Sequence, residues 1–149
     1  MTEPTSMQRI AALAGVAFLL FGIVGFVPGI TIHYGDLRLA GRGSGALLLG
    51  VFQVSVLHNL LHVAFGIAGL VLAKTARGAR AYLVGGGAAC ILLSIAGVLG
   101  AAGWLPANAA DDWLHLVVGA GLAGLGLVAG RAPARAAASN ASESRASPP

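Results

Sequence analysis

Three histidines in two apolar segments are the residues of this chain best suited to chemistry. His58 and His62 are four residues apart, and His115 stands in a second segment that repeats the pattern Asn/Asp-x-Leu-His-x-x-x-Gly found around His62. Imidazoles with this helical spacing can bind one metal ion, and a third imidazole from a neighbouring helix can complete such a site. Because ionisable side chains in apolar segments are costly, they usually face the interior of a helix bundle.

Two further polar residues belong to the same candidate site. Asn59 and Asp112 each precede a histidine by three residues, and they therefore lie close to its face of the helix. Glycines continue the strip at Gly66, Gly69 and Gly119, where they allow close packing of helix backbones. The candidate ligand or proton-handling residues are His58, His62, His115, Asn59 and Asp112.

Three interpretations of this polar strip are open from the sequence. The first, which we prefer, is a non-enzymatic membrane component with a structural interior, in which histidine and asparagine bond between helices and an aspartate caps the last helix. The second is a ligand site, either a divalent metal held by the three histidines or a haem b between His62 and His115. The third is transport of protons or small solutes along the strip. The sequence contains no recognisable catalytic constellation, so we predict neither enzymatic activity nor a cofactor, and keep the metal and the haem as alternatives.

The composition of the chain indicates a membrane protein. Of 149 residues, 57% are hydrophobic and only 9% are charged, and the mean hydropathy is +0.86. A soluble domain carries about 25% charged residues, so lipid must solvate most of this chain. The net charge of +4 comes from basic residues spread between apolar segments, which indicates membrane anchoring and no nucleic-acid partner. The lipid bilayer is the expected partner, and a homo-oligomer or another membrane protein is left open.

Four apolar segments are long enough to cross a bilayer, which requires roughly 20 residues per helix. We predict spans at about 10–27, 51–73, 82–103 and 113–130, within one membrane domain over 9–130. Disordered tails are predicted at 1–8 and 131–149, and the sequence leaves open whether 46–55 belongs to the second span. The fold class is therefore an all-α integral membrane protein with four transmembrane helices. Since the two histidine motifs lie in the second and fourth spans, we expect two tandem hairpins.

Basic residues predict the orientation of these spans. One side carries Arg9, Lys74, Arg77, Arg80, Arg131 and Arg135, and the other carries Arg38 and Arg42. Because cytoplasmic flanks are enriched in Lys and Arg, both termini are predicted to be cytoplasmic, in the cytoplasmic (inner) membrane. Trp104 and Trp113 at the outer boundary and Tyr82 at the inner boundary fit the aromatic belts of such proteins.

Two strings of the sequence resemble a family of small bacterial membrane proteins known as domain of unknown function 4383. They are Val51-Phe-Gln-Val-Ser-Val-Leu-His58-Asn59-Leu-Leu-His62-Val-Ala-Phe-Gly66 and Trp113-Leu-His115-Leu-Val-Val-Gly119. The resemblance covers roughly residues 8–131. It implies a four-helix inner-membrane protein, and it brings no activity, substrate or cofactor with it.

Overall fold

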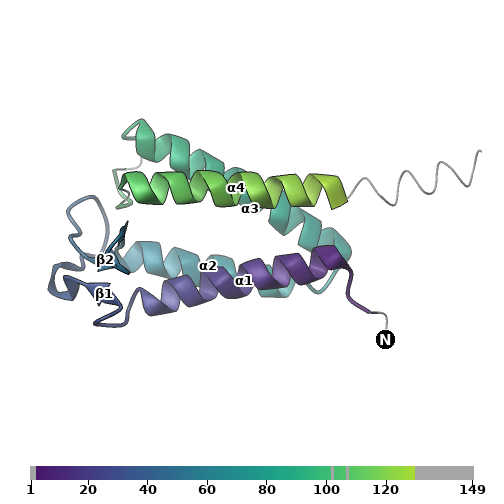
Figure 1. Ribbon diagram of the computed structural model, residues 1–149, viewed down its shortest axis with the longest axis horizontal. Coiled ribbons are helices and arrows are strands. Elements are labelled where there is room, and N and C mark those ends of the chain that lie inside the picture. The colour runs from purple at the N-terminus through teal and green to yellow at the C-terminus, as the bar shows by residue number, and fades with distance from the viewer. Residues whose placement is uncertain (1–2, 102, 107, 130–149) are drawn as a thin grey trace, which may run out of the picture.

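The computed structural model describes residues 3–101, 103–106 and 108–129, in which four helices form two antiparallel hairpins (Figure 1). α1 (Ser6–Val24) packs mainly against α2 (Val56–Leu72), and α3 (Ala76–Val98) packs mainly against α4 (Ala109–Ala129). The start of α1 and the end of α4 lie at the same end of the bundle (Figure 1). The predicted tail at 131–149 lies outside the described residues.

Three of these helices, α1, α3 and α4, are long and apolar enough to cross a membrane. α2 has 17 residues and spans roughly 25 Å at the usual helical rise. Large apolar side chains point outward from the bundle; Leu13 is 69% exposed, Val98 72% and Val117 66%. Such surfaces require lipid as solvent, so the chain is a membrane protein.

α1, α3 and α4 begin earlier in the chain than the hydropathy pattern predicts. α1 starts at Ser6, inside the predicted disordered tail, because the Thr5 side chain accepts a hydrogen bond from the Gln8 amide in a capping box. α3 starts at Ala76 instead of near residue 82, because the Thr75 side chain accepts from the Gly78 amide at 3.0 Å. Capping residues, and not the edges of the apolar runs, therefore decide where these helices begin.

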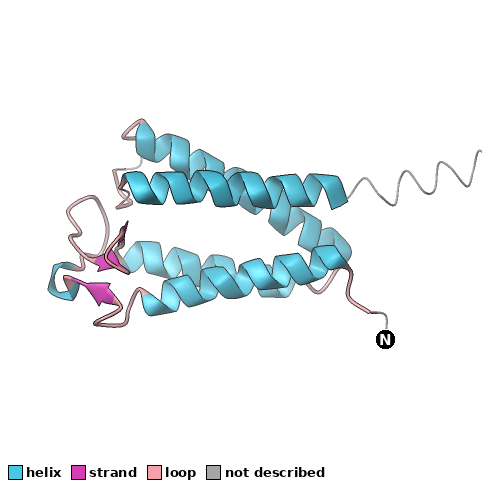
Figure 2. Ribbon diagram, in the orientation of Figure 1, coloured by secondary structure: helices cyan, strands magenta, loops and turns pink. Residues whose placement is uncertain are grey.

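The largest departure from the prediction is a small structure between α1 and α2, residues 25–55, named here the outer cap. Its strands are β1 (Thr31–Ile32), β2 (Leu47–Leu48) and β3 (Phe52–Gln53), which pair antiparallel in the order β1-β2-β3 (Figure 2). A 3-10 turn covers Tyr34–Asp36. The chain is therefore mainly but not entirely helical, and the second helix begins at Val56 instead of residue 51. Ser55 sets this start, because its side chain accepts a hydrogen bond from the His58 amide at 3.1 Å.

The outer cap also joins the two hairpins. The Gln53 amide donates to the Asp111 carboxylate at 2.9 Å, and the Asn108 side chain donates to the Val51 carbonyl at 2.7 Å. Asp111 also accepts from the Asn108 amide at 3.3 Å, while the Asn108 side chain accepts from the Asp111 amide at 3.0 Å. These reciprocal bonds form a capping box that starts α4. Asp111 thus fixes the beginning of α4 against the outer cap.

Replacing Asp111 with alanine is expected to loosen α4 from the outer cap. Asp111 is 2% exposed, so its loss leaves two amides without an acceptor and lowers the free energy of unfolding by about 1–3 kcal/mol. Hydrogen exchange at the Gln53 amide, followed by mass spectrometry, should become at least about tenfold faster. Asp36→Ala, at an exposed position of the outer cap, should leave that exchange unchanged. An unaltered rate at Gln53 in Asp111→Ala would contradict this connection.

Glycines bring the helices of each hairpin into backbone contact. A Cβ at Gly66 would lie 2.7 Å from the Gly15 carbonyl oxygen, and a Cβ at Gly119 would lie 2.7 Å from the Gly87 carbonyl oxygen. Gly69 also lies against α1, where a Cβ would be 2.8 Å from the Gly15 Cα. Such close approach is what small residues permit between helices in a membrane.

The two hairpins are structural repeats. Gly15 of α1 and Gly25, which caps the end of α1, have the same sequence spacing as Gly87 and Gly97 of α3. At the outer ends of these pairs, Gly25 lies against Asn59 and Gly97 lies against Asp112. Equivalent residues of the two histidine motifs therefore make equivalent contacts in the two halves of the chain.

Tyr82 does not take part in an aromatic belt, and that part of the prediction is wrong. Its side chain is 3% exposed, and its ring lies 4.9 Å from that of Phe65 between α2 and α3. Gly69 provides the space for the ring, because its lack of a Cβ leaves room beside α2. Trp104 and Trp113, at 53% and 67% exposure, remain at the surface.

Candidate functional site

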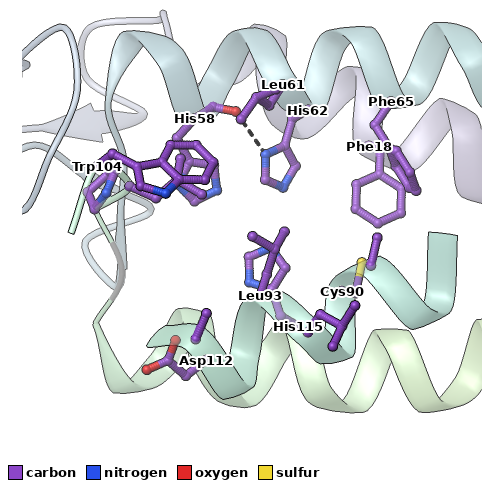
Figure 3. A pocket seen from close by; sticks show the side chains of 15 residues that line it. Phe18, His58, Leu61, His62, Phe65, Cys90, Leu93, Trp104, Asp112 and His115 are labelled. Atoms are coloured by element: carbon purple, nitrogen blue, oxygen red, sulfur yellow. Dashed lines mark hydrogen bonds between the residues drawn. The ribbon is translucent and has the colours of Figure 1, made fainter. Parts of the chain in front are cut away.

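The three histidines converge between the two hairpins. His58 and His62 on α2 and His115 on α4 each present one ring nitrogen, and these nitrogens lie within 4.8 Å of one another. The ring centroids are 4.6 Å apart for His58 and His62, and each of these rings lies 6.0 Å from that of His115. Figure 3 shows His62 and His115 approaching one another from α2 and α4.

Hydrogen bonds determine which nitrogen is free in two of these rings. His62 Nδ1 lies 3.1 Å from the His58 carbonyl oxygen, and His115 Nδ1 lies 2.8 Å from the Asp111 carbonyl oxygen. Because a carbonyl can only accept, Nδ1 carries the proton in both rings and Nε2 keeps a free lone pair. Metal-ligating histidines are oriented in this way, with the second ring N–H donating to a backbone carbonyl or a carboxylate.

His58 is the most buried of the three histidines. Its side chain is 7% exposed, and its Nδ1 has no hydrogen-bond partner among the described residues. A buried polar atom without a partner costs about 1–3 kcal/mol, so proteins rarely contain one without a reason. His58 also lines a cavity, and a ligand that bonds to Nδ1 would remove this cost.

The spacing of the three rings suits a small ion better than a haem. Nitrogens at about 2.0 Å from a tetrahedral zinc ion are roughly 3.3 Å from one another, so small side-chain rotations would bring all three into range. A haem held by two histidines requires its wide macrocycle to lie between them. The ring of His58, stacked at 4.6 Å on His62 and 6.0 Å from His115, stands where such a macrocycle would extend.

Asn59 and Asp112, the other two predicted site residues, face the partner helices within their own hairpins. Asn59 is 1% exposed against Gly25, at the end of α1, and its Nδ2 has no partner among the residues described. Asp112 lies against Gly97 of α3, although it also lines the cavity (Figure 3). Side chains three residues apart on a helix point in directions that differ by about 60°. Asn59 and Asp112 therefore do not point in the same direction as the histidines that follow them.

A cavity of about 520 Å³ adjoins the histidines, between the two hairpins (Figure 3). Most of the remaining wall is apolar and includes Phe18, Leu61, Phe65, Cys90, Leu93 and Trp104. A smaller cavity of about 210 Å³ is also bordered by the three histidines. Sequence reasoning did not find these walls, because an apolar residue in an apolar segment gives no signal of which neighbour it will face.

Comparison with known proteins identifies a family but no activity. The family model described as Domain of unknown function (DUF4383) matches residues 8–128, which include all three histidines. No curated protein and no solved structure matches the chain significantly.

Proposed function

The chain belongs to the DUF4383 family, a domain of unknown function, and from that premise we propose that it is a non-enzymatic membrane protein that binds one divalent transition-metal ion through three histidines. The convergence of His58, His62 and His115 within 4.8 Å supports this proposal most directly. Imidazole ligands favour zinc and its neighbours in the first transition row. Three histidines would leave one position of a four-coordinate ion available to a further ligand.

The structural interior preferred from the sequence has less support. Interhelical hydrogen bonds were its premise, but His62 and His115 bond to backbone carbonyls of their own helices. His58 and Asn59 each retain a buried nitrogen with no partner in the described part of the chain. A ligand site accounts for the unpartnered ring nitrogen of His58, and a hydrogen-bonded interior accounts for neither nitrogen.

We propose binding rather than catalysis because the carboxylates near the histidines have structural contacts. Asp111 accepts hydrogen bonds from two backbone amides, those of Gln53 and Asn108. Asp112 packs against Gly97 at the outer end of α3. Although Asp112 lines the larger cavity and Asp111 borders the smaller one, these contacts leave neither carboxylate free to act as a general base.

We also propose four membrane spans, with both termini cytoplasmic in the inner membrane. α2 lies along the full-length span α1, and the outer cap extends it on one side. The turn after α2 and the start of α3, which contain Lys74, Arg77 and Arg80, lie at the end of the bundle where α1 starts and α4 ends (Figure 1). Arg38 and Arg42 lie in the outer cap, at the opposite end. This asymmetry supports a cytoplasmic location for the end where α1 starts and α4 ends.

The metal content of the purified protein tests the proposal. Protein purified in mild detergent without chelator, loaded with zinc and desalted, is expected to retain about one ion per chain by elemental analysis. Its absorption spectrum should contain no Soret band, and binding should weaken as the pH falls because protons compete for the ring nitrogens. Retention below about 0.1 ion per chain would overturn the proposal. A Soret band in protein as isolated would instead indicate a haem.

A further inference from the structure

The cavity beside the histidines opens sideways toward the bilayer. Leu61 of α2 and Leu92 of α3 both line it and are 43% and 65% exposed, so they form an apolar rim. α2 and α3 pack much less closely against one another than the helices within each hairpin do. A molecule dissolved in the membrane can therefore reach the histidines between α2 and α3 without crossing water.

The polar groups of the cavity lie toward one end. Phe18, Phe65 and Cys90 surround the opposite end, beyond the histidines (Figure 3). A matching ligand has one compact polar head and a long apolar body. A quinone fits this pattern less well because its two carbonyls lie at opposite sides of the ring, and a phospholipid fits less well because of its bulky headgroup.

We propose that the cavity binds a long-chain fatty acid from the bilayer, with its carboxylate at the three histidines and its chain against Phe18 and Phe65. This inference rests on the proposed function, because a carboxylate oxygen would occupy the open fourth position of the ion. The apolar walls would surround the chain, but a chain that arrives from lipid gains little free energy by this burial. Shape and the carboxylate–ion contact therefore provide the selectivity.

Binding of labelled palmitate to the full-length, zinc-loaded protein in detergent tests this inference. Ala89 and the adjacent Ala88 are both exposed, but of the two only Ala89 lines the cavity. About one palmitate per chain should bind, and Ala89→Trp should weaken binding at least about tenfold by filling the cavity. Ala88→Trp should leave palmitate binding unchanged, and both variants should retain zinc. Hexadecanol, which has the same chain but no carboxylate, should bind at least about tenfold more weakly than palmitate.

The outcomes separate this inference from the proposed function. Zinc retention without palmitate binding, or palmitate binding that is insensitive to Ala89→Trp, overturns the inference and leaves the metal site intact. Removal of zinc with a chelator should weaken palmitate binding at least about tenfold. Palmitate binding by a protein that retains no zinc overturns the proposed function and, with it, the contact between carboxylate and ion.

Discussion

Replacing His115 with alanine is expected to weaken zinc binding at least about a hundredfold, because the loss of an outer-shell partner alone costs about 10–100-fold and His115 would be a direct ligand. His115 is also the one histidine in the second half of the sequence, so the second hairpin has no substitute. Competition with a chromophoric zinc chelator measures the affinity, and circular dichroism checks that the helices are retained. His62→Ala should have an effect of similar size.

His33 provides a matched control for these variants. It lies in the outer cap, exposed, with a φ of 51°. Asparagine tolerates this left-handed conformation better than alanine does, so His33→Asn removes an imidazole with little strain. This variant should bind zinc as the unaltered protein does. If His115→Ala also bound zinc with unaltered affinity and lost only thermal stability, the histidines would be structural residues and not ligands.

Alanine at Gly87 is expected to lower the free energy of unfolding by about 1–3 kcal/mol, the usual cost of overpacking. The added Cβ would lie 2.6 Å from the Ala123 amide nitrogen and 2.6 Å from the Gly119 carbonyl oxygen. Both are backbone atoms of α4, so relief of the contact requires α3 and α4 to separate. Thermal unfolding in detergent, followed by circular dichroism, measures the effect. Zinc affinity should also fall, because α4 carries His115.

Gly85 is the matched control, since it lies in the same run of three glycines as Gly87. A Cβ at Gly85 meets nothing within 4 Å. Gly85→Ala should therefore leave stability unchanged or raise it by about 0.4–1 kcal/mol, because alanine restricts the unfolded chain. Equal destabilisation by both substitutions would show that these glycines act through backbone flexibility and not through contact with α4.

The sequence predicted the helical hairpins and the histidine cluster because both follow from periodicity. His58 and His62 share a face by their spacing, and His115 meets them because its motif repeats theirs in an equivalent helix. The family resemblance drawn from the two histidine strings is confirmed by the match over residues 8–128. Asn59 and Asp112 were placed on the same strip, but a three-residue offset directs them toward their partner helices.

The outer cap could not be predicted from hydropathy. Residues 46–52 are apolar apart from a glycine, and a hydropathy average does not distinguish two-residue strands from helix. The strands depend on pairing with a distant segment, Thr31 opposite Leu48, and on a tight turn. In that turn Leu49 and Gly50 have φ values of 53° and 73°, which are incompatible with a right-handed α-helix. Tertiary pairing thus overrides the local apolar pattern.

The repeated hairpins also allow the site to be viewed in evolutionary terms. Duplication and fusion of one ancestral hairpin would produce such a pair of halves, and the metal site would then descend from the interface of a homodimer. In that dimer one residue of each subunit would have corresponded to both His58 and Asp111, and another to both His62 and His115. Fusion would have allowed the two copies to differ: one position now carries the imidazole of His58, and the other carries the carboxylate of Asp111 that anchors the outer cap. A symmetric dimer could not have divided these two tasks between equivalent residues.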